Sequence, residues 1–427
     1  MHIVDATLFF APHSGGVKRY LLAKRQFFSG RTDLRHTLVV PGAWNRRHEP
    51  GVVEMGCMRI PGGGGYRLPL NVVQWSRTLR DLEPDLIEAA DPYHLAWVAL
   101  GVADRLGIPA VAFAHSDLAR LFGDRFAPSI GRAAGAYLKH LYRRFDCVLA
   151  PSRLIAERLG DLGIDNVAIQ PLGVDGTVFH PSRADPTLRE DLGLAPDTRL
   201  LIFAGRMARE KEIPLLLRVL AELGPHYHLL LVGGERREML APNVTMLPYE
   251  QDPAALARLL ASSDALIHAG RHETFGMILI EAMACALPVI AVRAGAVTEI
   301  VDPCVGRIAT PDDARSLADA TRSIFAGDRD AMGAFSRARA ERDYLWQNTL
   351  PRLEQRYADL VRMRASDAVL AQSDAYGASG SPLHVRDAHM DAWTHARKEN
   401  LDGDMSEHTG AISAADALPN AEVPEAA

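Results

Sequence analysis

Short apolar runs alternate with longer amphipathic segments along most of the chain. The apolar runs have the length of strands, and the segments between them carry apolar residues at helical spacing. This alternation predicts an α/β fold in which helices cover both faces of a doubly wound parallel sheet. In the first half, the predicted strands are His2–Phe10, Arg35–Val40, Leu86–Ala90, Pro109–Ala114, Asp146–Ala150 and Val167–Pro171, and the predicted helices are Val17–Phe28, Leu70–Leu82, His94–Leu106, Ile130–Arg144 and Arg153–Leu162.

A Pro- and Gly-rich stretch from Pro171 to Pro181 interrupts the alternation and has the composition of a linker. The alternation then resumes, which predicts a second parallel-sheet unit of similar size. Its predicted strands are Leu200–Ala204, His228–Val232, Thr245–Leu247, Ala265–His268 and Pro288–Val292, and its predicted helices are Ile213–Leu223, Ala254–Ala261 and Gly276–Cys285. We therefore expect one domain over residues 1–172 and another over residues 173–343.

The C-terminal part of the chain differs in composition from both units. Tyr344–Val361 is amphipathic and predicts a final helix over residues 344–362. Residues 363–427 are rich in Ala, Asp, Ser, Gly and Glu, so we expect a disordered acidic tail. From Glu399 to the end there are seven acidic residues and no Lys or Arg. The whole-chain net charge of −6 therefore leaves a nearly neutral body, which argues against a nucleic-acid binder.

Several classes of protein are excluded by what the sequence lacks. Four cysteines, Cys57, Cys147, Cys285 and Cys304, have no metal-site spacing and indicate reduced thiols. The chain has no run of about 18 apolar residues and no basic leader before its first apolar run, so we expect a cytoplasmic protein. It has neither a P-loop nor a GxGxxG after the first strand, which disfavours P-loop NTPases and simple dehydrogenases. Dispersed histidines give no metal site.

The richest motif runs from His268 to Pro288 and carries Glu273-Thr274-Phe275-Gly276-Met277 and then Glu281. An apolar strand ends near His268, a Gly-containing loop follows, and a helix begins near Gly276. The first-turn amides of such a helix direct free donors and the positive end of the dipole toward a ligand above the sheet. Thr274 and Glu273 as helix caps, with Glu281 on the surface, form the alternative interpretation.

Three further motifs lie between a strand and the next helix. Gly205-Arg206 followed by Lys211 places two cations at the end of a buried strand, which suits a nucleoside diphosphate; a solvated basic loop is the alternative. The Gly15-Gly16 pair allows close approach of a ligand to the backbone, although a plain turn fits as well. His115 follows a predicted strand at the end where open α/β sheets bind ligands, and a structural histidine is its alternative.

Together these motifs resemble the retaining glycosyltransferases of family 4. The resemblance rests on Gly15-Gly16, Gly205-Arg206 with Lys211, the Pro171–Asp175 stretch with Phe179, and Glu273 through Pro288, and it covers residues 1–362. It implies the GT-B fold, in which two Rossmann-like domains face a central cleft and a final helix returns to the first domain. It also implies that no metal or other cofactor is required.

The resemblance assigns roles to individual residues of this chain. Arg206 and Lys211 would hold the donor diphosphate together with Gly205, and Glu281 would bond the ribose hydroxyls. Glu273 would contact the transferred sugar, with Thr274 and the amides of Phe275, Gly276 and Met277 nearby. Gly15 and Gly16 would admit the diphosphate, His115 would lie beside the sugar, and the nucleobase would pack near Leu247 and Tyr249. Of these, His115, Arg206, Lys211 and Glu273 are the expected catalytic residues.

The function implied is transfer of a hexose, such as mannose or glucose, from a nucleotide-diphosphate sugar to a hydroxyl of a sugar, lipid-linked or small-molecule acceptor. The alternatives are a nucleotide-sugar epimerase and a non-catalytic nucleotide-sugar binder of the same fold, and transfer to an added acceptor would separate them. The basic amphipathic segment from Ile130 to Phe145 allows peripheral contact with the inner face of a membrane, with a solvated basic helix as the alternative.

Overall fold

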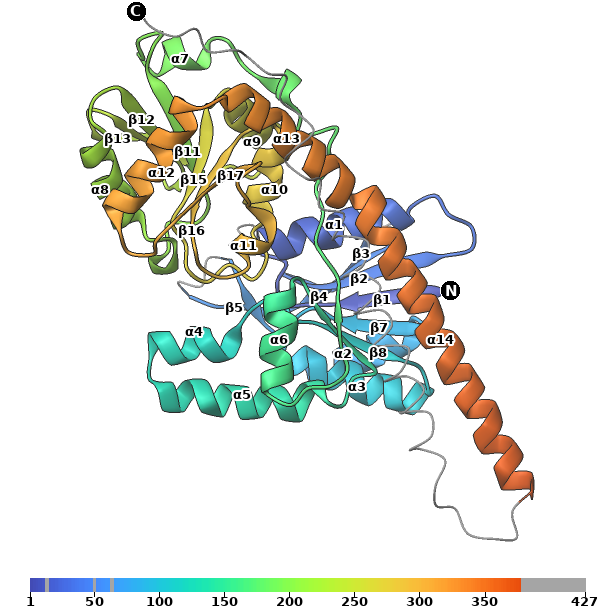
Figure 1. Cartoon of the computed structure of the whole chain (residues 1–427). Coiled ribbons are helices and arrows are strands. Elements are labelled where there is room, and N and C mark those ends of the chain that lie inside the picture. Colours follow the sequence, from blue (N-terminus) through green and yellow to red (C-terminus); the bar gives the residue numbers. More distant parts are fainter. Residues whose placement is uncertain (12–14, 49–50, 62–64, 378–427) are drawn as a thin grey trace, which may run out of the picture. The chain divides into compact units, whose positions relative to one another are not determined.

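The chain forms two parallel α/β sheets, as the alternation of its apolar runs predicts (Figure 1). The computed structural model describes residues 1–11, 15–48, 51–61 and 65–377. All strands of the first sheet lie within residues 2–169, and all strands of the second lie within residues 199–309. Within the described residues, no helix combines the length and the apolar character needed to cross a membrane.

The first sheet has eight strands in the order β10-β9-β8-β7-β1-β2-β4-β3. All neighbouring strands are parallel except β3 and β4. The strands are β1 (His2–Ala6), β2 (Arg35–Gly42), β3 (Arg46–His48), β4 (Val52–Gly56), β7 (Leu86–Ala89), β8 (Ala110–Phe113), β9 (Cys147–Ala150) and β10 (Val167–Ile169), with a separate hairpin of β5 (Met58–Arg59) and β6 (Arg67–Leu68). The helices are α1 (Gly16–Phe28), α2 (Val72–Asp81), α3 (His94–Leu106), α4 (Leu118–Arg125), α5 (Pro128–Tyr142) and α6 (Arg153–Asp161).

The second sheet has seven strands in the order β13-β14-β12-β11-β15-β16-β17, and only β13 runs antiparallel to its neighbour. The strands are β11 (Arg199–Ala204), β12 (Tyr227–Gly234), β13 (Glu238–Ala241), β14 (Val244–Pro248), β15 (Ala265–His268), β16 (Val289–Val292) and β17 (Gly306–Ala309). The helical elements are η1 (Pro181–Arg183), α7 (Leu188–Asp191), η2 (Arg209–Lys211), α8 (Ile213–Leu223), α9 (Pro253–Ala261), α10 (Met277–Ala284), α11 (Val297–Ile300), α12 (Ala314–Ala326) and α13 (Arg329–Asp343).

Alternate residues of the central strands belong to different apolar cores. In β11, Leu200 and Ile202 pack with α9 and α10, whereas Leu201 and Phe203 pack on the opposite face with α8 and α12. Figure 1 shows these two helix layers on either side of the second sheet. Because helices cover both faces of the sheet, the central strands are continuous apolar runs in the sequence. Ligands can reach such a sheet at the carboxyl ends of its strands.

The final helix is longer than the sequence predicts. α14 spans Trp346–Gly377 and contains Pro351 in its first turns. Its buried part contacts the first domain: the Tyr357 hydroxyl accepts a hydrogen bond of 2.6 Å from Lys24, and Gln170 donates one of 3.0 Å to the carbonyl of Thr349. The prediction that disorder begins at residue 363 is wrong for 363–370, because Ala- and Leu-containing sequence extends a helix that is already nucleated. Residues 378–427 of the predicted tail lie outside the described residues.

Candidate active site

A cavity of about 540 Å³ lies where strands of both sheets end. Its volume is in the range of small-molecule sites. It brings together the following residues predicted from the sequence: Gly15, Gly16, His115, Gly205, Arg206, Lys211, Tyr249, Glu273, Thr274, Phe275, Gly276, Met277 and Glu281. Leu247 is the exception, because its side chain lies on β14 and packs against the apolar core instead of lining the cavity.

Helix α10 presents its N-terminus to the cavity. Gly276 immediately precedes it at φ +98°, a left-handed conformation that favours glycine, and a Cβ there would meet Leu279 at 2.8 Å. The interpretation of Thr274 and Glu273 as helix caps is wrong, since no side chain caps this helix. The Thr274 hydroxyl instead donates to the carbonyl of His115 at 2.9 Å. The first-turn amides of α10 therefore remain available to a ligand.

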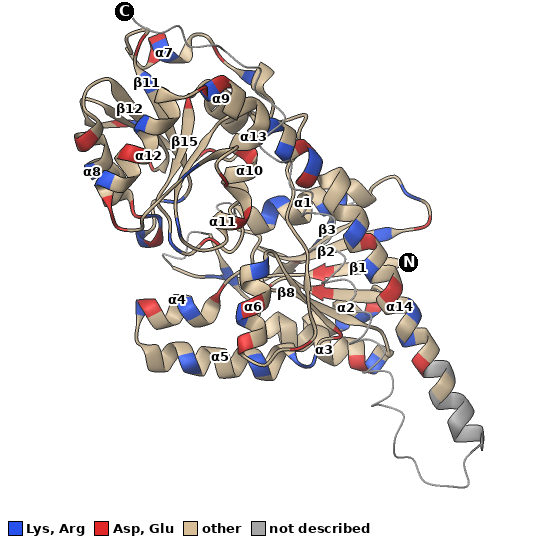
Figure 2. Ribbon diagram, in the orientation of Figure 1, with Lys and Arg blue, Asp and Glu red and all other residues tan. Residues whose placement is uncertain are grey.

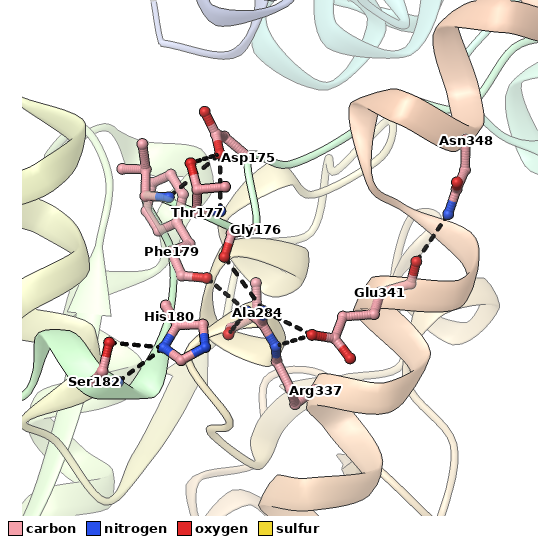
Figure 3. Close-up of polar contacts among 11 residues, drawn as sticks. Asp175, Gly176, Thr177, Phe179, His180, Ser182, Ala284, Arg337, Glu341 and Asn348 are labelled. Atoms are coloured by element: carbon pink, nitrogen blue, oxygen red, sulfur yellow. Dashed lines mark hydrogen bonds and ion pairs between the residues drawn. The ribbon is translucent and has the colours of Figure 1, made fainter.

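The other end of α10 is held by Arg337 of α13. The Arg337 guanidinium donates to the carbonyl of Ala284, the last residue of α10, at 2.5 Å. It also donates to the carbonyls of Phe179 at 2.8 Å and Gly176 at 3.3 Å, both in the segment that links the two sheets (Figure 3). A cation at a helix C-terminus interacts favourably with the helix dipole. Arg337 thus fixes α10 to the linker.

Glu273 lies between two groups that favour its charged form. The Lys211 ammonium donates to Glu273 Oε1, and His268 Nε2 lies 3.0 Å from the same oxygen. His268 Nδ1 accepts from the Gly270 amide at 3.2 Å, which leaves Nε2 as the ring nitrogen next to the carboxylate. Burial opposes ionisation of Glu273, but Lys211 and His268 outweigh it and hold the pKa of this carboxyl well below its usual range. Glu273 is therefore an anion with a fixed orientation.

Arg206 is held more loosely than Lys211. Its side chain is 59% exposed, and its nearest carboxylate, Glu210, lies 3.6 Å away. The loop that carries it begins at Gly205, whose carbonyl would lie 1.8 Å from a Cβ on Gly233. Gly233, at φ +147°, must therefore be a glycine for the two strand ends to come this close. The resulting loop places one closely paired and one loosely paired cation at the same rim.

Glu281 faces the cavity from within α10 and is paired across it. Its side chain is 1% exposed, and Arg19 of α1 donates to its Oε1. Burial raises the pKa of Glu281, and Arg19 offsets part of that rise. The first residue of α1, Gly16, packs against the first residue of α10, since a Cβ on Gly16 would lie 3.2 Å from Met277 Sδ. The N-termini of α1 and α10 thus adjoin at the cavity.

His115 lines the cavity as a half-buried, neutral imidazole. Its ring stacks on Phe113 with centroids 3.9 Å apart and planes inclined by 2°. Burial, and next the positive charge of Lys24, lower its pKa to about 3. Its Nε2 has no hydrogen-bond partner within the described part of the chain. A neutral ring with an unused nitrogen suits a hydrogen bond to a sugar hydroxyl better than general acid catalysis.

Aromatic side chains line the first-sheet side of the cavity. Phe9 packs edge-on against Tyr66 at 6.1 Å and against Tyr93 at 5.8 Å between ring centroids. Tyr249 lines the same cavity from the segment after β14. Such rings provide the apolar faces on which sugars and bases stack. Over the described ranges, no three His, Cys, Asp or Glu side chains form a group able to hold a metal ion.

The sequence interpretation missed Arg19 and His268 as site residues. Arg19 lies three residues after Gly16, one helical turn from the Gly pair, so helical spacing could have drawn attention to it. His268 ends β15 directly below the loop that carries Glu273. Its contact with Glu273 depends on how the loop folds back, which strand periodicity does not report.

Comparison with known proteins places this site in a family context. The family Glycosyltransferase Family 4 matches residues 14–177, and Glycosyl transferases group 1 matches residues 184–339. The chain is 32% identical over 371 residues to a GDP-mannose-dependent alpha-(1-6)-phosphatidylinositol dimannoside mannosyltransferase from Mycobacterium tuberculosis, covering 81% of this chain and 93% of the relative. It is 38% identical over 234 residues to a GDP-mannose-dependent alpha-mannosyltransferase from Mycolicibacterium smegmatis, covering 53% and 60%.

Among solved structures, the fold is similar to that of a sucrose-phosphate synthase from Thermosynechococcus elongatus. The TM-score is 0.71 at 21% identity, and the match covers 85% of this chain and all of the other. This likeness supports the two-domain GT-B architecture expected from the motifs.

Proposed function

The chain belongs to glycosyltransferase family 4, and we propose that it transfers mannose from GDP-mannose to a hydroxyl of a phosphatidylinositol mannoside. The observation that carries this proposal is the cavity in which Arg206, Lys211, Glu273 and Glu281 converge. The relatives named above are GDP-mannose-dependent, which favours this donor over UDP or ADP sugars.

The cations of the cavity would receive the donor diphosphate. Arg206 is exposed and only loosely paired, so its guanidinium can form two parallel bonds to phosphate oxygens. Lys211 would add a point charge, and the N-terminus of α10 would add amide donors. As diphosphate departs, negative charge accumulates on it, and these preorganised groups would stabilise that charge.

Glu273 and His115 would contact the transferred sugar. The anionic Glu273 can accept hydrogen bonds from sugar hydroxyls, and Lys211 keeps it charged. We propose that the bond between the anomeric carbon and the diphosphate oxygen breaks as the acceptor oxygen bonds to the same face of that carbon. Attack on the same face retains the α configuration. The acceptor proton would pass to the departing phosphate oxygen.

The base and the acceptor would occupy opposite sides of this centre. Tyr249 lines the cavity on the second-sheet side and would stack on the base, with Leu247 behind it in the core. The aromatic side chains Phe9, Tyr66 and Tyr93 would border the acceptor sugar on the first-sheet side. The C–H groups of a sugar ring form an apolar face, and aromatic rings such as these can pack against it.

A lipid-linked acceptor implies a route to the membrane surface. Helix α5 carries Arg132 and Lys139 and no acidic residue (Figure 2). Phe126, just before α5, is 62% exposed, and Ile130, in the first turn of α5, is 42% exposed. We propose peripheral contact of this α4–α5 hairpin with anionic lipid, because exposed apolar side chains beside cations favour an interfacial position. Flotation with phosphatidylglycerol vesicles should capture the protein, and Phe126→Asp should weaken capture; equal capture by phosphatidylcholine vesicles would contradict the electrostatic part.

We also propose that catalysis requires no metal, since Arg206 and Lys211 supply the countercharge for the diphosphate. Transfer should persist in excess EDTA. Complete loss of transfer, restored by magnesium or manganese, would contradict the assignment of these two residues.

The decisive experiment for the function uses the purified full chain with GDP-mannose, UDP-glucose or ADP-glucose and a phosphatidylinositol mannoside. Mass spectrometry should detect a product larger by one hexose only with GDP-mannose, and NMR should give an α linkage. Lys211→Met serves as the inactive control. Donor cleavage without transfer, or preference for a different nucleotide sugar, would overturn the proposal.

A further inference from the structure

Arg19 and Glu281 form an ion pair between the first turn of α1 and the middle of α10. The Arg19 side chain is 24% exposed, whereas that of Glu281 is 1% exposed. Both residues line the cavity. The pair therefore lies within the proposed donor site and joins an element of each sheet.

Glu281 is only partly satisfied by this pair. Arg19 donates to Oε1, but Oε2 is buried and has no hydrogen-bond partner within the described ranges. A buried carboxylate oxygen without a donor is costly, and such atoms are rare unless a ligand or water completes them. The two neighbouring hydroxyl groups of a ribose are two hydrogen-bond donors. If each donates to one carboxylate oxygen of Glu281, the ribose competes with Arg19 for Oε1.

Arg19 also occupies an electrostatically unusual position. It lies in the first turn of α1, where the helix dipole favours anions, and that turn holds Lys18 and Arg19 but no acid. The adjoining N-terminus of α10 adds a second positive dipole end. An anion in the cavity would therefore find amide donors and the Arg19 guanidinium directed at the same place.

We propose that Arg19 exchanges partners when the donor binds: the ribose takes Glu281, and the released guanidinium moves to the diphosphate. This inference rests on the proposed function, since it assumes a nucleoside-diphosphate donor. It makes Arg19 a third diphosphate-binding cation, contributed by the first domain. It also couples occupation of the ribose site to the phosphate contacts.

The exchange predicts opposite effects of Arg19 on two ligands. Guanosine carries a ribose but no phosphate. Its ribose must displace Arg19 from Glu281, but guanosine has no phosphate with which the released guanidinium could form an ion pair. GDP breaks the same pair but offers phosphate oxygens in return. Removing Arg19 should therefore tighten guanosine binding and weaken GDP binding.

Calorimetric titrations with guanosine and GDP test this on Arg19→Ala, with Lys18→Ala as the matched control. Lys18 lies in the same helical turn, carries the same charge and contacts Phe10. For Arg19→Ala, the GDP Kd should rise about tenfold or more, the size expected for a charge-assisted contact, and the guanosine Kd should fall severalfold. In a Glu281→Ala background, the gain for guanosine should vanish. Lys18→Ala should leave both affinities close to those of the native chain.

Each other outcome has a definite meaning. Weakening of both ligands by Arg19→Ala would mean that the pair is merely structural, and no change in either would mean that Arg19 is not used; both overturn the inference. A native chain that binds UDP or ADP instead of GDP overturns the proposed donor, and the Arg19 test can then be repeated with that nucleotide and its nucleoside.

Discussion

Two clusters of charged side chains within the described residues, one around Lys24 and one in the cavity, differ in how completely their charges are paired. In the first domain, Lys24 donates to Asp5 at 2.8 Å and to the Tyr357 hydroxyl at 2.6 Å, and it lies 3.1 Å from Glu88. Tyr20 and Tyr357 also donate to Glu88, and His36 lies 2.8 Å from Asp5. The ammonium and both carboxylates of this cluster are fully paired.

The cavity cluster is paired only in part. Lys211 and Glu273 form one pair and Arg19 and Glu281 another, yet Glu281 Oε2 lacks a donor among the described residues. His115 Nε2, at the border of the cavity, is equally unpartnered there. The Lys24 cluster therefore completes the packing of α14 on the first sheet, with only the second ring nitrogen of His36 left unpartnered among the described residues, whereas the cavity cluster leaves a carboxylate oxygen for the ligand that we propose. This difference separates charges that stabilise the fold from charges that serve catalysis.

The largest expected effect is on stability, at Lys24. Lys24→Met would leave Asp5 and Glu88 as neighbouring buried carboxylates without their cation. Breaking a buried pair in this way costs about 3–5 kcal/mol of unfolding free energy. Urea unfolding followed by circular dichroism measures it, with Lys18→Met as the control. A loss below about 1 kcal/mol would show that the cluster does not have the structural role we assign to it.

The next effect is on catalysis, at Glu273. Glu273→Ala should lower transfer by about two orders of magnitude, which corresponds to roughly 3 kcal/mol of transition-state stabilisation. Its melting temperature should change little in comparison with that of Lys24→Met. Steady-state kinetics decide the matter: near-normal turnover with a raised donor KM would show that Glu273 binds the donor without acting on the sugar.

The smallest effect is a pH dependence of stability from His115. Its pKa is about 3 in the folded chain, below the value of about 6.5 expected when unfolded. Below pH 6.5 the imidazole of His115 binds a proton in the unfolded state but stays neutral in the folded state. The free energy of unfolding therefore falls as the pH falls toward 3. This group alone contributes about 2 kcal/mol of that loss at pH 5. His115→Asn should lose less stability between pH 7 and pH 5 than the native chain, and an equal loss would contradict a neutral His115.

The fold was largely predictable because the central strands are buried on both faces. Runs such as Leu200–Ala204 and Ala265–Ile267 are apolar throughout, and the predicted helices His94–Leu106 and Ile213–Leu223 match the structure residue for residue. The edge strands β3 and β13 are partly exposed and carry charge, so they lack that signal. The buried faces of α12 and α13 are narrow and include small or polar residues such as Thr321 and Ser336, and the apolar pattern does not predict these two helices.

The site residues could be predicted where several of them lie close together in one short motif, as from Glu273 to Glu281. Contacts between distant segments were not. Arg19 and Glu281 are separated by 262 positions, and Lys24 and Tyr357 by 333. Leu247 shows a related limit: it packs against the apolar core from β14, whereas Tyr249 and Glu250, beyond the strand, line the cavity.

The thermal shift produced by GDP at one fixed concentration, 100 times its Kd for the native chain, tests the contrast between the two clusters most directly. A ligand present at 100 times its Kd stabilises the folded chain by about 2.7 kcal/mol. Lys24→Met should lower the melting temperature of the free protein and keep the GDP-induced rise. Glu281→Ala should leave the free protein near its native melting temperature and lose most of that rise. The reverse pattern, in which Glu281→Ala destabilises the free protein and Lys24→Met abolishes the response to GDP, would contradict the account.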